Sequence, residues 1–205
     1  MSYIIVGLGN PGEEYEGTRH NTGAMAVRAF ERQQGFSAWQ SDKKLKALVS
    51  EGGLESVSST GRVRKENVML LLPQAFMNKS GFSVKSLVLN KRDGKKFIVV
   101  YDDLDLPIGR MKISFGRNSG GHKGVESVIQ SLGTKEFVRV RIGIAPITLR
   151  GVMKKPSGEK KILDFIMGKF TKKEHEEMER TVGRAMRALM TVVAKGKEKA
   201  MQEFN

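Results

Sequence analysis

Short apolar segments separated by polar turns form the basic pattern of this chain. Branched and aromatic residues cluster over a few positions at a time, which is typical of strands. Such segments lie at residues 3–6, 47–50, 68–72, 96–101, 111–115 and 137–144. Helical spacing of apolar residues falls between several of them, at residues 22–34, 81–89 and 124–132. Helices that alternate with strands predict an α/β fold with a mixed, twisted β-sheet flanked by α-helices.

The C-terminal segment has the most regular pattern. Thr171 and Glu174 have the spacing of a capping box, which satisfies the first backbone N–H groups of a helix. Apolar residues then recur three and four positions apart, at Met178, Val182, Ala185, Met186, Leu189 and Val193. We therefore expect a long C-terminal amphipathic helix that packs on the sheet.

Nothing in the pattern divides the chain, because it contains neither an internal repeat nor a low-complexity block. We expect a single domain over residues 1–205. Residues 148–161 are rich in Lys and Gly and are predicted to form a mobile basic loop within that domain.

Composition is that of a globular protein, with 39% hydrophobic and 28% charged residues. No window approaches the roughly 18 consecutive apolar residues of a membrane span, and the N-terminus lacks the pattern of a secretory signal. We therefore expect a cytoplasmic protein with no membrane partner. The absence of cysteine excludes disulfides, Cys-ligated zinc, iron–sulfur clusters and thiol nucleophiles.

Charge changes this picture, since 36 Lys and Arg residues against 22 Asp and Glu residues give a net charge of +14. Such an excess is typical of proteins that bind a polyanion, and RNA or DNA is the leading candidate. A merely solvated basic surface is the alternative.

The first strand is followed by Gly7-Leu-Gly-Asn-Pro-Gly12, which matches the glycine fingerprint of dinucleotide-binding enzymes. That fingerprint must open a helix at once, whereas here an acidic segment, residues 13–20, comes first. We therefore disfavour a dinucleotide site. The amide of Asn10 could instead donate to and accept from a peptide main chain. His20 precedes a helix N-terminus, whose dipole favours a neutral ring that can accept a proton at pH 7.

A second candidate cluster follows the strand at residues 96–101, in the segment Asp102-Asp-Leu-Asp105-Leu-Pro107. Its carboxylates could ligate a divalent metal, or one of them could hold a histidine in its working tautomer. In the second case Asp102 would support a general base, while Asp105 is explained by turn capping alone.

Three further segments carry candidate binding groups. The glycine loop at residues 117–124 leads into a helix, and its amides and cations suit phosphate. The alternation in residues 137–144 sends Arg139 and Arg141 to the face opposite the core, where they could contact phosphate or pair with surface carboxylates. In residues 76–81 we expect Phe76 and Met77 to pack, and Asn78 to cap a helix or donate to a substrate carbonyl.

Six motifs in one order resemble the bacterial-type peptidyl-tRNA hydrolase family, and the likeness spans nearly the whole chain. They are Gly7-Leu-Gly-Asn-Pro-Gly12, Thr18-Arg-His-Asn21, Phe76-Met-Asn-Lys-Ser-Gly81, Asp102-Asp-Leu-Asp-Leu-Pro107, Gly120-Gly-His122 and Arg139-Val-Arg-Ile-Gly-Ile144. The resemblance implies a monomeric mixed-sheet α/β protein that hydrolyses the ester between a peptide and the 3′ ribose of tRNA. This reaction recycles tRNA after ribosomal drop-off and needs no metal or other cofactor.

The resemblance also implies roles for residues of this sequence. His20 resembles the catalytic base and Asp102 its orienting partner, while Arg141 matches a residue that grips tRNA phosphate. Asn21 is expected only to support its neighbours. The residues assigned to substrate binding are Asn10, Tyr15, Met77, Asn78 and Lys123.

Departures from the family pattern concern binding more than the catalytic pair. Lys123 stands where an asparagine is expected, and Ser114 where many members have a phosphate-gripping lysine. Lys112 lies two residues away on the same strand face and could replace that lysine. Asp103 stands for a more usual glutamate, and Ala145 for a glycine.

Two rival functions remain open from the sequence. The first is an RNA-binding protein on the same fold that has lost hydrolysis. Retention of His20, Asp102, Asn10 and Asn78 argues against it, whereas Lys123 argues mildly for it. The second is a metal-dependent phosphoesterase built on the acidic segment.

Overall fold

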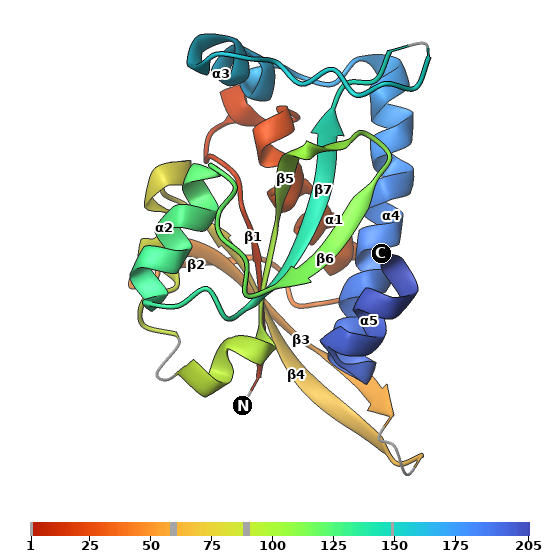
Figure 1. The fold of residues 1–205 in the computed structure, drawn as a ribbon. Helices are drawn as coiled ribbons and strands as arrows, with labels where there is room; N and C mark the ends of the chain where they lie inside the picture. The colour runs from red at the N-terminus through yellow and green to blue at the C-terminus, as the bar shows by residue number, and fades with distance from the viewer. Residues whose placement is uncertain (1, 58–60, 88–90, 149) are drawn as a thin grey trace.

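The computed structural model describes residues 2–57, 61–87, 91–148 and 150–205 (Figure 1). Within them the chain forms a seven-stranded mixed sheet with the order β2-β3-β4-β1-β5-β7-β6. Its central strands, from β4 to β7, are parallel, whereas β2–β3, β3–β4 and β6–β7 pair antiparallel. The strands are β1 Tyr3–Gly7, β2 Gln40–Asp42, β3 Ala47–Val57, β4 Val63–Pro73, β5 Phe97–Pro107, β6 Met111–Phe115 and β7 Val138–Ala145.

Helices cover both faces of the sheet. The α-helices are α1 Thr22–Gln34, α2 Lys123–Leu132, α3 Glu159–Met167, α4 Lys172–Lys195 and α5 Lys197–Phe204. The described residues also contain four 3-10 segments, namely η1 Glu13–Tyr15, η2 Arg19–Asn21, η3 Met77–Ser83 and η4 Lys91–Lys96. None of the helices in the described residues has the length and apolar character needed to span a membrane.

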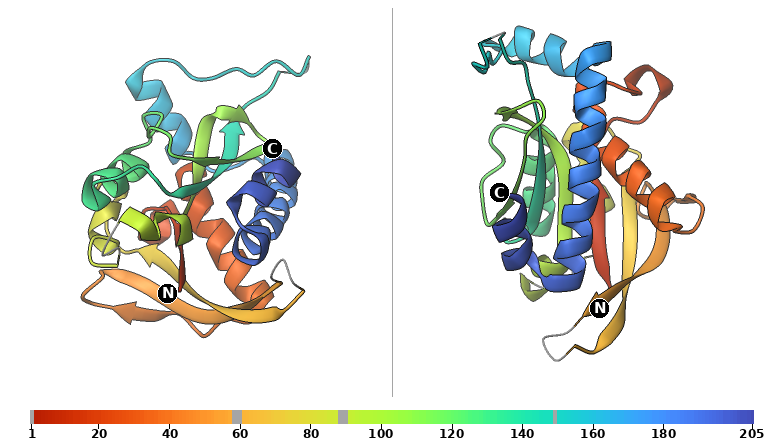
Figure 2. Two further views of the ribbon diagram at one scale, coloured as in Figure 1. Left: turned by 60° about the horizontal axis from the view of Figure 1, so that its bottom comes forward. Right: turned by 90° about the vertical axis from the view of Figure 1, so that its right-hand side faces the viewer.

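Two apolar cores form because successive side chains of a strand point to opposite faces. On β5, Ile98 and Val100 belong to the core that includes residues of α1 and α4, whereas Val99 and Tyr101 belong to the core on the α2 side. A sheet covered on both faces explains the continuous apolar runs of its central strands, such as residues 68–72 of β4 and 97–101 of β5. The antiparallel β3–β4 hairpin extends beyond this covered region (Figure 2).

The predicted mixed α/β fold and its long C-terminal amphipathic helix are confirmed. Thr171 and Glu174 make both bonds of the capping box at the start of α4. Met178, Ala185 and Leu189 along that helix are at most 1% exposed, as the apolar stripe predicts.

The predicted helix at residues 81–89 is wrong. The 3-10 helix η3 ends at Ser83 and a turn follows through residue 87, while residues 88–90 lie outside the described part. Side-chain hydroxyls take backbone partners here, since Ser80 donates to the Met77 carbonyl and Ser83 to the Lys46 carbonyl. Such bonds compete with helix formation. Gly81 also lies so close to α2 that a Cβ would fall 2.2 Å from the Ser127 carbonyl.

The predicted loop at residues 148–161 has a different C-terminal boundary, because Glu159 begins α3. Ile147, just before this segment, forms an isolated antiparallel bridge with Met153. Lys155 then forms an ion pair of 2.5 Å with Asp105 of β5. The mobility of this loop stays a prediction.

Candidate active site

His20 and Asp102 meet although 82 positions separate them in the sequence. His20 lies in η2 just before α1, and Asp102 lies in β5, which continues through the acidic segment instead of ending before it. The imidazole Nδ1 is 3.1 Å from Oδ1 and 3.0 Å from Oδ2 of the carboxylate. Both side chains are buried. The two residues that the sequence assigns to base and orienting acid thus form one unit.

The segment that carries His20 is held by the C-terminal part of the chain. The neighbouring Arg19 guanidinium donates to Glu174 of α4 at 2.9 Å and stacks on the rings of Phe165 and Phe170. The Arg19 backbone N–H also donates to the Gly168 carbonyl at 3.0 Å. This anchoring fixes the backbone from which the imidazole reaches Asp102.

The contact with Asp102 determines which nitrogen of His20 can act as a base. When Nδ1 donates its proton to the carboxylate, Nε2 keeps a lone pair and can accept a proton. Burial lowers the pKa of His20, but the charge of Asp102 and its hydrogen bond raise it, and Lys123 lowers it again, so that the pKa lies above its ordinary value. The sequence argument from the helix dipole is therefore outweighed by the carboxylate.

Asp102 is shared with a second imidazole, that of His122. His122 Nε2 lies 3.0 Å from Asp102 Oδ1, and the two histidine rings are 4.9 Å apart between centroids. Burial raises the pKa of Asp102, but its two imidazole partners lower it well below its ordinary value. Sequence reasoning named His122 only in a glycine loop and in a family motif. Histidine is not among the preferred N-cap residues, so its contacts carried no local sequence signal.

A divalent metal is chemically conceivable here, because ligand atoms of His20, Asp102 and His122 lie within 4.8 Å of one another. The alternative of a metal site built from the neighbouring carboxylates of the acidic segment is disfavoured, however, since these carboxylates have separate partners. Asp103 pairs with Arg141 at 2.6 Å and Asp105 with Lys155 at 2.5 Å. Asp105 is thus an ion-pair partner, and not the turn cap that the sequence suggests.

Asn10 lies in the loop that follows β1 and is fixed from both sides. The side-chain amide of Asn21 bonds the Asn10 backbone, accepting from its N–H at 2.8 Å and donating to its carbonyl at 2.9 Å. The side-chain Oδ1 of Asn10 accepts from the Met77 N–H at 2.8 Å. The side-chain oxygen thus already accepts one backbone hydrogen bond within the chain. The Nδ2 of Asn10 is the group left for a substrate, with no partner among the described residues.

Of three more predicted substrate residues, Met77 contacts Asn10 directly. Met77 is 5% exposed and packs in the α2-side core, whereas Asn78 is exposed. Tyr15 meets Phe76 edge to face, with ring centroids 6.3 Å apart. Phe76, expected to be a packing group, packs against Tyr15 but remains 57% exposed. A cavity of about 220 Å³ adjoins Asn10 and Asn21.

The predicted phosphate residues form a separate group on β6 and β7. Arg141 lies directly opposite Lys112 in the β6–β7 register. Both line a cavity of about 580 Å³ together with Arg117 and Asp103. The Nε of Arg141 donates to Asp103, which leaves the terminal nitrogens as donors. Lys123 is exposed at the first turn of α2 and near enough to His20 to lower its pKa.

Arg139 does not share this role, which corrects the sequence expectation that it is free for phosphate. Its side chain is fully buried, lies over the Phe137 ring, and donates to the carbonyls of Asn118 and Lys135. Alternation along β7 does place it on the face of Arg141, but the loop before α2 covers that part of the face. Arg139 therefore holds the loop.

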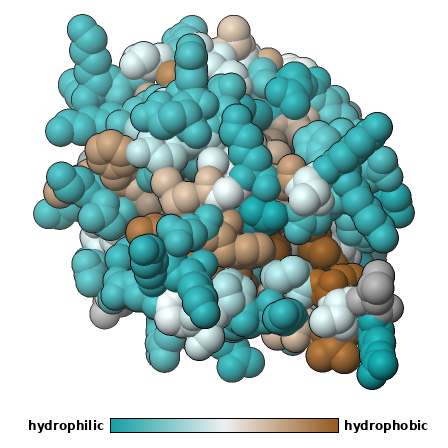
Figure 3. Space-filling view, turned by 90° about the horizontal axis from the view of Figure 1, so that it is seen from above, coloured by the Kyte–Doolittle hydropathy of each residue, from teal (hydrophilic) through white to brown (hydrophobic). Residues whose placement is uncertain are grey.

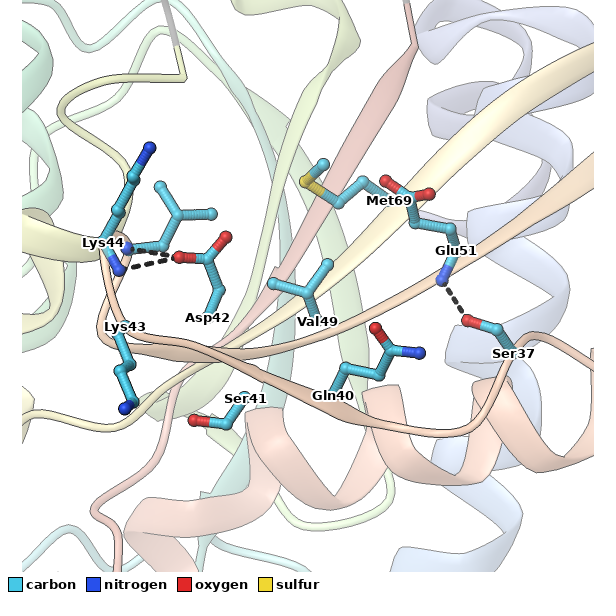
Figure 4. Close-up of a pocket in the computed structure, with 10 residues that line it drawn as sticks. Ser37, Gln40, Ser41, Asp42, Lys43, Lys44, Val49, Glu51 and Met69 are labelled. Atoms are coloured by element: carbon cyan, nitrogen blue, oxygen red, sulfur yellow. Dashed lines mark hydrogen bonds between the residues drawn. The ribbon is translucent and has the colours of Figure 1, made fainter.

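The surface around these groups is mixed in character. The end of the molecule near α3 is mostly hydrophilic, with apolar side chains exposed between the polar ones (Figure 3). A larger pocket of about 900 Å³ lies along the β2–β3 hairpin, with Asp42, Lys43 and Lys44 at one end and Glu51 at the other (Figure 4). It contains none of the predicted site residues.

Comparison with known proteins gives one consistent result. The family model described as peptidyl-tRNA hydrolase matches residues 4–205. The chain is 35% identical over 203 residues to "Peptidyl-tRNA hydrolase" of Syntrophotalea carbinolica, covering 98% of this chain and 96% of that protein. It is 38% identical over 204 residues to the protein of the same name from Carboxydothermus hydrogenoformans, covering 99% and 98%. A crystal structure of peptidyl-tRNA hydrolase from Acinetobacter baumannii has a TM-score of 0.81 and 28% identity, covering 100% of this chain and 94% of that one.

Proposed function

Because this chain belongs to the peptidyl-tRNA hydrolase family, we propose that His20 is the general base of its reaction and that Asp102 orients it. The protein is a hydrolase of peptidyl-tRNA and cleaves the ester between the peptide and the 3′ ribose. The contact of His20 Nδ1 with both oxygens of Asp102 is the observation that carries these roles.

The tautomer of His20 determines which of its nitrogens accepts the proton in the reaction. Its Nε2 takes a proton from a water molecule as the water oxygen bonds to the ester carbonyl carbon. The tetrahedral intermediate then collapses, the bond from carbon to the ribose 3′ oxygen breaks, and that oxygen takes the proton from His20. The products are a peptide carboxylic acid, which ionises, and free tRNA. Asp102 stabilises the imidazolium between the two steps.

The peptide is held by amide contacts. Asn10 Nδ2 and the Asn78 side chain donate to main-chain carbonyls of the peptide, and Met77 with Tyr15 supplies apolar contact beside them. Such contacts read the backbone and not the side chains of the peptide, so that many peptide sequences are accepted. Asn21 supports this arrangement through its two bonds to the Asn10 backbone.

The tRNA is held mainly by charge. Arg141, Lys112 and Lys123 contact phosphates, which position the RNA without reading its sequence. Asp103 supports phosphate binding by Arg141. Its carboxylate accepts from Arg141 Nε and keeps the guanidinium in place, and the terminal nitrogens of Arg141 are left to donate to phosphate. Recycling of tRNA after ribosomal drop-off places the enzyme in the cytoplasm, where it acts as a monomer without a metal or other cofactor.

Release of free tRNA from purified peptidyl-tRNA tests this function. Turnover by the wild-type chain and its loss in His20→Ala, with tRNA binding retained, supports the assignment. Comparable turnover in the variant contradicts the role of His20. Full activity in EDTA separates this mechanism from the metal-dependent one, whereas abolished activity contradicts the metal-free mechanism. The family match also disfavours an RNA-binding protein without hydrolysis, which would bind tRNA and release nothing.

A further inference from the structure

His122 makes two hydrogen bonds that together fix its tautomer. Its Nδ1 accepts from the Val125 backbone N–H at 3.2 Å, which makes it the N-cap of α2. An imidazole nitrogen that accepts a hydrogen bond carries a lone pair, so the proton of the neutral ring is on Nε2. That nitrogen lies 3.0 Å from Asp102 Oδ1 and therefore donates to it. The helix backbone thus aims the Nε2 proton at the carboxylate.

The Asp102 carboxylate accordingly accepts hydrogen bonds from two imidazoles. Asp102 Oδ1 is 3.1 Å from His20 Nδ1 and 3.0 Å from His122 Nε2, and Oδ2 is 3.0 Å from His20 Nδ1. Asp102 is 3% exposed, so little water competes for these oxygens. Each donor takes part of the negative charge, and the donor from His122 weakens the attraction of the carboxylate for the proton on His20.

We propose that His122 is a positioning residue of this hydrolase, which holds the Asp102 carboxylate against the His20 ring and limits how strongly that carboxylate favours the charged form of His20. The proposal rests on the proposed function, in which His20 accepts a proton from water. A general base must be neutral at the working pH. A buried carboxylate that accepted a hydrogen bond from His20 alone would favour its charged form, the imidazolium. His122 acts through Asp102 and takes no part in bond making.

The other titratable groups near His20 do not replace the effect of His122 on Asp102. Lys123, at the start of α2, lowers the pKa of His20. The charge of Arg19, on the same 3-10 segment, is paired with Glu174 of α4. Tyr101 of β5 lies edge to face against His122, and burial raises its pKa to about 12, so its ring is neutral. Asp102 is thus the carboxylate that directly contacts His20, and His122 is its second partner.

Two substitutions separate the bridge to Asp102 from the helix cap. His122→Asn keeps a side chain that can cap α2 but is too short to reach Asp102. His122→Gln reaches Asp102 with an amide N–H and lacks the Nδ1 acceptor. Each variant removes one of the two bonds, so a purely structural role and the proposed role predict different results.

The first readout is an NMR titration of the histidine rings, which needs no substrate. The chain has only three histidines, and the exposed His175 of α4 serves as an internal reference. We expect the neutral forms of His20 and His122 to carry their protons on Nδ1 and Nε2, respectively. His122→Asn should raise the pKa of His20 by about one pH unit, whereas His122→Gln should leave it near the wild-type value.

The second readout is the pH dependence of kcat/KM with purified N-acetyl-aminoacyl-tRNA. His122→Asn should move the acid limb upward by the same amount, with about a 10-fold loss on that limb and KM within about twofold of wild type. His175→Gln, on the exposed face of α4, should match the wild type in both readouts. The proposal is overturned if the pKa of His20 is unchanged in His122→Asn. It is also overturned if His122→Gln shifts this pKa as much as His122→Asn does. Activity that survives in His20→Ala contradicts the proposed function instead, and the NMR result can still be read.

Discussion

Asp102 and Asp103 are adjacent residues of β5 that serve two different regions. Asp102 is buried and bonded by His20 and His122, so its charge acts on a proton. Asp103 pairs with Arg141 at the cavity that Lys112 also lines, so its charge acts on a cation that faces the solvent. Because neighbouring side chains of a strand point to opposite faces, one segment serves both hydrolysis and RNA binding. The comparison indicates that the two functions can be changed separately.

Asp102→Asn should have the largest effect of the single changes considered. The amide can no longer stabilise the imidazolium and can favour the wrong tautomer of His20, so kcat should fall about 10²–10⁴-fold. KM and tRNA affinity should stay within about threefold of wild type, because the phosphate-facing group is intact. Steady-state kinetics and a filter-binding assay with uncharged tRNA measure the two quantities. A matching loss of tRNA affinity would show that the regions are not separable.

Arg141→Ala should give the opposite pattern. Loss of one phosphate contact should raise KM about 10-fold, leave kcat within about twofold, and reduce the slope of log affinity against log salt by about one. Arg141→Lys is the matched control, because it keeps the charge and should retain most of the salt slope. An unchanged slope in the alanine variant would remove this contact from the tRNA interface.

Lys123 adjoins both regions, and Lys123→Asn should therefore affect each of them slightly. The charge of Lys123 lowers the pKa of His20, so its removal should raise that pKa further. Since His20 must be neutral to act, kcat/KM falls as the pH drops through this pKa, and the acid limb should move upward by a few tenths of a pH unit. KM for the tRNA substrate should rise about twofold to fivefold. A limb that moves to lower pH would contradict the assignment of His20 as base.

Lys155→Ala should have the smallest effect. The ion pair with Asp105 is exposed on both sides, with 42% and 51% of the side chains accessible. Pairs of this kind contribute less than about 1 kcal/mol, so the melting temperature and kcat should barely change. Thermal unfolding and kinetics at two salt concentrations test this. A large loss of kcat would show that the segment joining Lys155 to α3 belongs to the hydrolytic region.

Sequence reasoning could find the pair of His20 and Asp102 because His20 precedes a helix and Asp102 follows an apolar run, and groups at such boundaries meet at one edge of an α/β sheet. The strand that carries Asp102 nevertheless continues to Pro107. It could not find that Asn10 Oδ1 is taken by the Met77 N–H or that Arg139 is covered, since both depend on loops folding over the sheet. The failure at residues 81–89 has a similar cause. Serine hydroxyls and close contact with α2 decided that segment, and its helical periodicity did not.

The anchoring of Arg19 has a consequence for biosynthesis. The imidazole is synthesised well before the residues that hold its backbone segment, Gly168, Phe165 and Glu174, which leave the ribosome much later. Domains form their long-range contacts only when the distant partners have been synthesised. A nascent chain that lacks these residues therefore carries the base without its anchor, and the complete centre assembles only after Glu174 has been synthesised.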